Sequence, residues 1–321
     1  MARVTSADVA RESGVSRTTV SYVLNGTPGT SVSEATRRRV LDTAARLGYA
    51  PSAAARTLRS GRSDLVLCVL PDWPVGPVVE TMLDHLADDL AERGLSVLVH
   101  HVRGDRPLAD LWRAVTPRTV VGLSAFDPED VRAMRRAGIQ VVDTSSDEPG
   151  AEDPQPHIGR LQVERLVDGG RTRIGYATTA DRRVSQFAEQ RLAGVREACA
   201  ERGLADPVVV AVDVDAASGM SAVATWRKAG VTGVAAYNDE VAFAVLAGAR
   251  AAGLRVPDDL AVVGVDDVPL AALSAPPLTT VTQSMDREAA YLAARVRAAL
   301  DGGPPPKRPA DVPRIVPRDS A

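Results

Sequence analysis

Apolar positions near the start of the chain repeat with the period of a helix, in two short stretches within residues 5–25. Val20, Val23 and Leu24 have the spacing of one buried helical face. Gly14 suits the positive φ with which a preceding helix ends. The pattern therefore predicts two short helices joined by a tight turn.

The second of these helices turns polar side chains outward. Ser6 and Ser16 are the expected N-caps of the two helices. Helices this short bury little core, so their surface should present something. The outward residues suited to base edges are Arg17, Thr18, Ser21 and Tyr22. We predict a helix-turn-helix; an ordinary helical hairpin is the alternative.

A third helix is predicted over residues 33–48, capped by Ser33 and stopped at Gly48. Its expected inward residues are Val40, Leu41, Ala44 and Leu47. Three arginines, 37–39, fall near its start, where they either contact DNA phosphates or form a solvated helix face.

An alanine-rich segment, 51–61, follows, with Leu58 as its one large apolar residue. About two helical turns are too few to be stable alone in water. The segment either folds when docked on DNA or on a partner subunit, or is a plain linker.

From residue 64 onward, apolar strands alternate with amphipathic helices. The expected strands are 65–71, 95–101, 119–125, 139–144, 173–178, 208–212, 233–237 and 260–267. The expected helices are 75–93, 106–115, 128–137, 158–168, 185–202, 217–229 and 239–252. Such alternation indicates a parallel sheet covered on both faces. A Pro- and acid-rich loop at 147–156 divides it into two doubly wound lobes.

Polar residues follow several predicted strands, namely Asp72, Trp73, Asp143, Asn238, Asp239 and Asp266. Ligands of doubly wound sheets bind at the carboxyl ends of the strands, here expected between the lobes. Each residue alone is as well explained as a loop residue or helix cap; their common position favours a ligand site.

Charge is distributed unevenly along the 321 residues. Residues 1–62 hold ten arginines against four acids, a net charge of +6, whereas the whole chain has −3. The rest therefore carries −9. A basic head on an acidic body is typical of a nucleic-acid-binding domain joined to another domain. The head lacks the large apolar face that membrane-surface binding would need.

Other features narrow the class of protein further. The N-terminus does not resemble a signal peptide, and no apolar run reaches the length of a membrane span. Cys68 and Cys199 are expected to be buried thiols in a reducing compartment. Nucleotide-binding, nucleophile-elbow and zinc-protease motifs are missing from the sequence. Asp213 and Asp215 hint weakly at a metal, although strand-end carboxylates are common.

A series of distinctive stretches follows the chain in order, namely DVARESGVSRTTVSYVLNG, VSEATRRRVLDTAARLGY, the hinge residues Pro51, Ala55, Arg56 and Leu58, QRLAGV, AYNDEVA, VPDDLAVVGVDD, PPLTTVTQ and RIVPRDS. In these stretches the chain resembles the lactose/galactose repressor family of bacterial regulators, and the resemblance extends over essentially the whole chain. The resemblance implies a dimeric repressor that binds a palindromic double-stranded operator under the control of a small-molecule effector.

The resemblance also implies which residues contact DNA. The full set is Ser6, Ser16, Arg17, Thr18, Thr19, Ser21, Tyr22, Asn25, Ala55, Arg56 and Leu58. Arg17, Thr18 and Tyr22 would read the major groove. Leu58 would be a wedge in the minor groove, with Ala55 packing at the same step.

For the effector, the resemblance points to Arg191, Asn238 and Asp266 in the second lobe and to Asp143 in the first. Asp72 and Trp73 complete the expected set, although they depart from the family's usual Asn-Pro-Phe-Phe-like turn. Val214 stands where some members have an aromatic platform for sugar rings. The resemblance implies a sugar or a related polar metabolite as the effector, and we expect no cofactor or metal.

Three domains follow from these assignments. Residues 1–50 would bind DNA, 51–63 would be the hinge, and 64–321 would bind effector and dimerise. The first lobe would comprise about 64–153 with 284–309, and the second about 154–283 with 310–321. The helix at 75–93 and part of 239–252 are expected at the dimer interface. The tail after 300 lacks leucine heptads, so no coiled-coil tetramer is expected.

We therefore expect a transcriptional repressor in the bacterial cytoplasm, at the nucleoid when bound to its operator. A soluble solute-binding protein has the same body, but would carry a secretory signal in place of the basic head. An α/β enzyme would need a catalytic constellation that the sequence lacks. Both alternatives are disfavoured.

Overall fold

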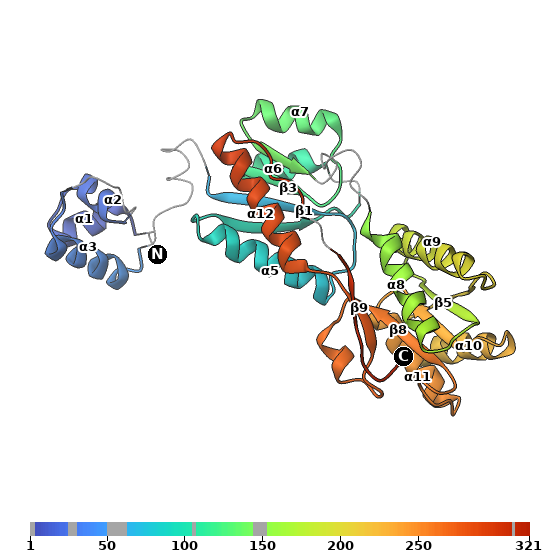
Figure 1. Ribbon diagram of the computed structural model, residues 1–321. Coiled ribbons are helices and arrows are strands. Elements are labelled where there is room, and N and C mark those ends of the chain that lie inside the picture. The colour runs from blue at the N-terminus through green and yellow to red at the C-terminus, as the bar shows by residue number, and fades with distance from the viewer. Residues whose placement is uncertain (1–3, 25–30, 50–62, 105–106, 144–152, 310–311) are drawn as a thin grey trace. The chain divides into compact units, whose positions relative to one another are not determined.

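The computed structural model describes residues 4–24, 31–49, 63–104, 107–143, 153–309 and 312–321 (Figure 1). The chain divides into two compact units. One comprises residues 1–65 with 115–118, and the other comprises the rest.

Three helices form the head, α1 (Ser6–Ser13), α2 (Arg17–Leu24) and α3 (Glu34–Arg46). They pack around a small core of Val9, Ala10, Val20, Val23, Val40 and Ala44. Gly14 has φ 67° and ends α1 as predicted. The backbone N–H of Thr19 donates to Ser16 Oγ at 3.0 Å, which confirms Ser16 as the cap of α2. The helix-turn-helix predicted from the sequence is present.

Two predictions for the head were wrong. The N-cap of α1 is Thr5, with Ser6 already inside the helix, because Asp8 reaches back to the Thr5 backbone N–H at 2.9 Å. On α3, Leu41 is 46% exposed. Thr43 lies on the buried face instead, with its hydroxyl donating to the Arg39 carbonyl at 2.8 Å.

The first lobe of the body has a four-stranded sheet of order β2-β1-β3-β4. Its strands are β1 (Leu65–Leu70), β2 (Ser96–His101), β3 (Thr119–Gly122) and β4 (Gln140–Asp143). Its helices are α5 (Pro77–Ala91), α6 (Leu108–Val115), α7 (Pro128–Arg136) and α12 (Met285–Asp301). Helices α5 and α12 pack side by side and share one apolar cluster with β1 (Figure 1). Cys68 is buried in β1, as expected.

The second lobe has a six-stranded sheet of order β10-β9-β8-β7-β5-β6, parallel except for β10. Its strands are β5 (Ile174–Thr179), β6 (Val208–Val212), β7 (Gly233–Ala236), β8 (Ala261–Val265), β9 (Thr279–Thr282) and β10 (Arg314–Val316). Its helices are α8 (Pro154–Asp168), α9 (Ser185–Glu201), α10 (Ala216–Lys228) and α11 (Asp239–Ala251), with short 3-10 turns η2 (Arg182–Val184) and η3 (Pro269–Ala272). This confirms the predicted class, a helical head with two doubly wound lobes.

The pattern of apolar residues misplaced one helix start and stopped short of the C-terminal elements. Helix α8 begins at Pro154, four residues before the predicted start, with Asp153 capping it. Prolines in a first helical turn cost nothing because those N–H groups lack helical partners anyway. None of the helices in the described part of the chain is long and apolar enough to cross a membrane.

Candidate DNA interface and effector site

The residues predicted to read DNA divide into outward contacts and caps. Arg17 and Thr18, at the start of α2, are exposed and make no hydrogen bond or ion pair within the described parts of the chain. Tyr22, one turn later, is 37% exposed. These three side chains are therefore available to base edges, as a recognition helix requires.

The other described candidates in the head are engaged locally. Ser16 Oγ lies 2.9 Å from Thr19 Oγ1, so these two hydroxyls satisfy each other while capping α2. Ser6 and Ser21 are half-buried. The remaining predicted DNA contacts, Asn25, Ala55, Arg56 and Leu58, lie outside the described residues.

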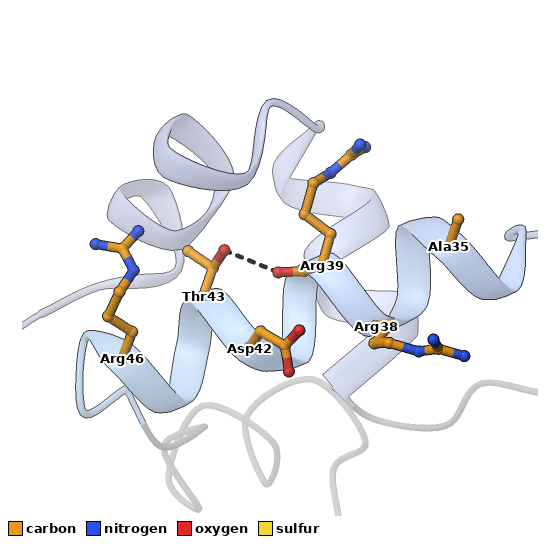
Figure 2. Close-up of a pocket in the computed structure, with 6 residues that line it drawn as sticks. All are labelled: Ala35, Arg38, Arg39, Asp42, Thr43 and Arg46. Carbon is orange, nitrogen blue, oxygen red and sulfur yellow. Dashed lines mark hydrogen bonds between the residues drawn. The ribbon is translucent and has the colours of Figure 1, made fainter.

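Helix α3 presents a cationic surface. Its residues Ala35, Arg38, Arg39, Asp42, Thr43 and Arg46 line a hollow of about 450 Å³ (Figure 2). Arg39 and Arg46 lie on the same side of α3 as Thr43, whereas Arg38 points to the other side (Figure 2). Arg46 pairs with Glu12 at 3.3 Å. Arg38 and Arg39 are exposed, so a phosphate could be reached without burying either charge.

In the second lobe, the candidate site centres on Arg191, which is 5% exposed on α9. Its Nε donates to Gln155 Oε1 at 2.7 Å, and its Nη1 donates to the Tyr237 carbonyl at 2.5 Å. The guanidinium carbon lies 4.9 Å from the centre of the Tyr237 ring. Nη2 approaches Asp266 Oδ1 at 3.9 Å. Two neutral acceptors thus fix the guanidinium, and Asp266 is its nearby charge.

Asp266 follows β8 in an uncommon backbone conformation. Its φ is 110°, and its N–H donates to the Val281 carbonyl at 2.7 Å. Burial raises the pKa of the Asp266 carboxyl to about 6, while Arg191 acts in the opposite direction. The carboxylate and the guanidinium together offer an acceptor and a donor side by side.

Asn238 and Asp239 follow β7, but they face different surroundings. Asn238 caps α11, its Oδ1 accepting from the Val241 N–H at 3.0 Å, and is half-buried. Asp239 is fully buried. The structure therefore places Asn238 near Arg191 through its neighbour Tyr237, and takes Asp239 out of reach of solvent.

The candidates of the first lobe are more exposed. Asp72 pairs with Arg103 at 3.4 Å and is half exposed, and Asp143 ends β4 half-buried. The Trp73 and Phe187 rings meet edge to face, with centroids 5.1 Å apart. Val214, at the expected position of an aromatic platform, is 63% exposed.

Sequence reasoning missed residues that support Arg191, above all Gln155 and Tyr237. Gln155 fell in a stretch assigned to a loop, and the structure places it in the first turn of α8. The weak metal signal at 213–215 has another explanation, because Asp215 caps α10 by accepting from the Ser218 N–H at 2.8 Å. Across the described residues, no group of three His, Cys, Asp or Glu could hold a metal ion.

Comparison with known proteins defines the class. Residues 5–52 match the family described as "Bacterial regulatory proteins, lacI family", and residues 163–321 match a periplasmic binding protein-like domain. A DNA-binding head joined to such a domain is the architecture of a transcriptional regulator with an effector-binding domain. The two matches exclude a solute-binding protein without DNA binding.

Full-length relatives identify the family. Catabolite control protein A of Priestia megaterium is 31% identical over 297 residues, 88% of each chain. The transcriptional repressor PurR of Photobacterium profundum is 28% identical over 295 residues, 87% of each chain. The chain therefore belongs to the lacI family: it is a DNA-binding transcriptional repressor with an effector-binding domain, and not an enzyme.

Solved structures agree with this fold. The regulator CelR in complex with cellobiose is 27% identical, with a TM-score of 0.66 over 99% of this chain and all of that one. The Lac repressor dimer bound to operator and an anti-inducer is 24% identical, with a TM-score of 0.77 over 99% of each chain. At that identity the second comparison supports the fold alone.

Proposed function

We propose that the protein is a homodimeric repressor that binds a palindromic operator and is controlled by a small polyhydroxylated metabolite, a sugar or a related compound, held by Arg191 and Asp266. The buried Arg191 carries this proposal. Burying a cation is unfavourable unless it is well paired, yet its ion pair with Asp266 is loose at 3.9 Å. A ligand hydroxyl that accepts from Nη2 and donates to Asp266 completes both groups.

Asn238 adds a donor, because its Oδ1 is committed to capping α11 and its NH₂ group remains to donate. Asp72, Trp73 and Asp143 contribute the first lobe's side of the site. Arg17, Thr18 and Tyr22 read base edges, while Leu58 kinks the operator centre from the minor groove with Ala55 packing at the same step.

Exposed apolar side chains support a dimer. On the first lobe these are Val75, Leu98, Val99 and Val102, and three of them lie on or next to β2, a sheet edge. In the second lobe, Leu270 and Leu273 are 61% and 78% exposed. Open edges and apolar patches of this kind are normally covered. Helix α11 itself is mostly buried, so we assign the second lobe's contact to the neighbouring turn η3.

Control follows from differential binding. A ligand that binds two lobe arrangements equally shifts nothing, so the effector must favour one of them. The lobe arrangement that the effector favours would then set the relative position of the two hinge segments in the dimer, and hence the affinity for the operator. The protein would act in the bacterial cytoplasm, at the nucleoid when bound to its operator.

A bandshift assay with palindromic operators, with and without candidate metabolites such as cellobiose, tests the proposal. Arg191→Ala should abolish the effector-induced change while the free protein still binds DNA. Arg160→Ala is the matched control, because Arg160 forms surface ion pairs with Glu197 and Glu201. A protein that prefers no palindrome over bulk DNA at moderate salt would refute the repressor proposal, and a retained response would remove Arg191 from the site.

A further inference from the structure

The carboxyl group of Asp239 lies behind the candidate effector site and takes no part in it directly. Asp239 is the first residue of α11 and is fully buried. Its Oδ1 accepts from the Thr280 hydroxyl at 2.6 Å, and its Oδ2 accepts from the Val268 N–H at 2.9 Å. It thus ties α11 to β9 and to the turn that follows β8.

That turn carries Asp266 in a conformation that needs support. Asp266 and Asp267 have φ values of 110° and 54°, a region that residues other than glycine rarely adopt. Consecutive strained residues persist only where surrounding contacts over-determine them. The Asp239–Val268 hydrogen bond fixes the residue immediately after this pair.

Thr280 links Asp239 to the turn a second time. Its hydroxyl donates to Asp239 and accepts, at 3.4 Å, from the Asp267 N–H. On the outer side, Arg318 Nη2 donates to Asp267 Oδ1 at 2.6 Å. The turn is therefore clamped from inside by Asp239 and Thr280 and from outside by Arg318.

The strand in front of the turn leaves room for the Asp239 carboxyl and for little else. A Cβ at Gly264 would lie 2.1 Å from Asp239 Oδ1. Burial raises the pKa of Asp239 to about 7, so the group is held at an energetic cost. The buried surroundings of Asp239 disfavour its charged form, yet its carboxyl fills a space that fits it closely. This combination indicates a role beyond packing.

We propose that Asp239 is a positioning residue of the effector site: it holds the 266–268 turn so that the Asp266 carboxylate faces Arg191. The consequence for effector binding rests on the proposed function. The positioning itself is a property of the free protein and can be measured without any effector.

The experiment is a pH titration of the Asp266 carboxyl carbon by NMR on full-length protein labelled at the aspartate carboxyl carbons, with Asp266→Asn identifying its signal. Asp239→Ala should lower the Asp266 midpoint by about half a pH unit or more, because a relaxed turn exposes the carboxyl to water and so removes the burial that raises its pKa. Asp239→Asn should keep the midpoint near that of the natural protein, since an amide can accept from Val268 and donate to Thr280.

Two further variants keep the test decisive. Thr280→Val conserves shape but removes the hydroxyl between Asp239 and Asp267, and should shift Asp266 in the same direction by less. Asp215→Ala deletes the cap of α10 in the same lobe; it should lower stability without moving the Asp266 midpoint. If Asp239→Ala does not fold, Thr280→Val decides.

The positioning role would be overturned if the Asp266 midpoint stayed within about 0.2 pH unit of its natural value in Asp239→Ala or, where that variant does not fold, in Thr280→Val. A shift of equal size in Asp215→Ala would also overturn it, because the shift would then be a general effect of lost stability. No metabolite is added in this titration. A failure to find any effector would therefore count against the proposed function and would not affect the test of Asp239 as a positioning residue.

Discussion

The head and the second lobe hold their candidate functional side chains in opposite ways. In the head, Arg17 and Thr18 are exposed and Tyr22 projects from α2. In the second lobe, Arg191 is buried and its guanidinium is fixed by hydrogen bonds to Gln155 and to the Tyr237 carbonyl. DNA presents a rigid array of hydrogen-bonding groups, so a recognition helix can contact it with flexible side chains. A small ligand makes few contacts, which would not offset the entropy lost in ordering a flexible binding site.

Glycines show the same contrast in backbone packing. Gly14 in the head has φ 67°, and among the described residues no atom apart from its chain neighbours and its own helix backbone lies within 4 Å of the place where a Cβ would be. A Cβ at Gly159 on α8 would lie 2.0 Å from the Arg191 carbonyl oxygen. The head uses glycine for its backbone conformation, and the second lobe uses it to bring α8 and α9 close enough for Gln155 to reach Arg191.

The largest expected effect comes from Gly159→Ala. The added methyl group would force α8 and α9 apart against a close-packed core, so we expect a loss of about 3 kcal/mol or more in unfolding free energy. Gly14→Ala, the matched control, should cost about 1 kcal/mol because only the backbone is strained. Chemical denaturation followed by circular dichroism measures both. Equal losses would mean that the contrast between the two regions is not one of packing.

The next effect is a pH dependence of stability that arises from Asp239. Its pKa of about 7 lies above the unfolded value near 4, so the folded state binds more protons between these pH values. The unfolding free energy therefore falls as pH rises through this window and stays lowered above pH 7. Asp239→Asn should remove this part of the slope.

Above pH 7 the Asp239→Asn variant should be more stable than the natural protein by about 2 kcal/mol, roughly half of what three pH units would give, because the interior relaxes around a charge. Thermal unfolding at pH 5 and pH 8.5 checks this. Asp266→Asn is a useful comparison, since the pKa of Asp266 is also raised, to about 6. A variant that loses stability equally at both pH values would show that the charge of Asp239 matters less than its shape.

Arg17→Ala tests the head's side of the comparison. Arg17 is exposed, so its removal should leave the unfolding temperature unchanged. Affinity for the cognate operator should fall about tenfold through loss of a base contact. Fluorescence anisotropy with cognate and scrambled duplexes distinguishes loss of a base contact from loss of a phosphate contact. If affinity for both duplexes fell equally, Arg17 would contact phosphate and not a base edge.

Much of the fold could be predicted because most elements carry their own signal. The helices and strands from 65 to 267 can be predicted from the period of their apolar residues. Gly14 and Ser16 can be predicted from the backbone conformation and the capping that these residue types favour. Leu41 was misassigned because a neighbour of Val40 on a helix lies 100° around it, a difference that one short helix does not resolve.

The support of the effector site could not be predicted in the same way. Gln155, Tyr237 and Asp239 act through contacts with residues 29 to 46 positions away in the chain. Their residue types carry no signal of such partners, and the Pro-rich start of α8 concealed Gln155 in an apparent loop. Outward residues such as Arg17 are easier to predict because they need no partner within the chain.

The smallest expected effect comes from Arg38→Ala, which distinguishes phosphate contacts from base contacts within the head. Arg38→Ala removes an exposed cation from α3, where the sequence left phosphate contact and a solvated face as equal alternatives. If Arg38 contacts a phosphate, affinity should fall about threefold for cognate and scrambled duplexes alike, and the slope of log affinity against log salt should decrease by about 1. Arg46→Ala is the matched control, because Arg46 is already paired with Glu12 and should change the slope less. An unchanged slope in Arg38→Ala would assign the residue to the solvated face of α3.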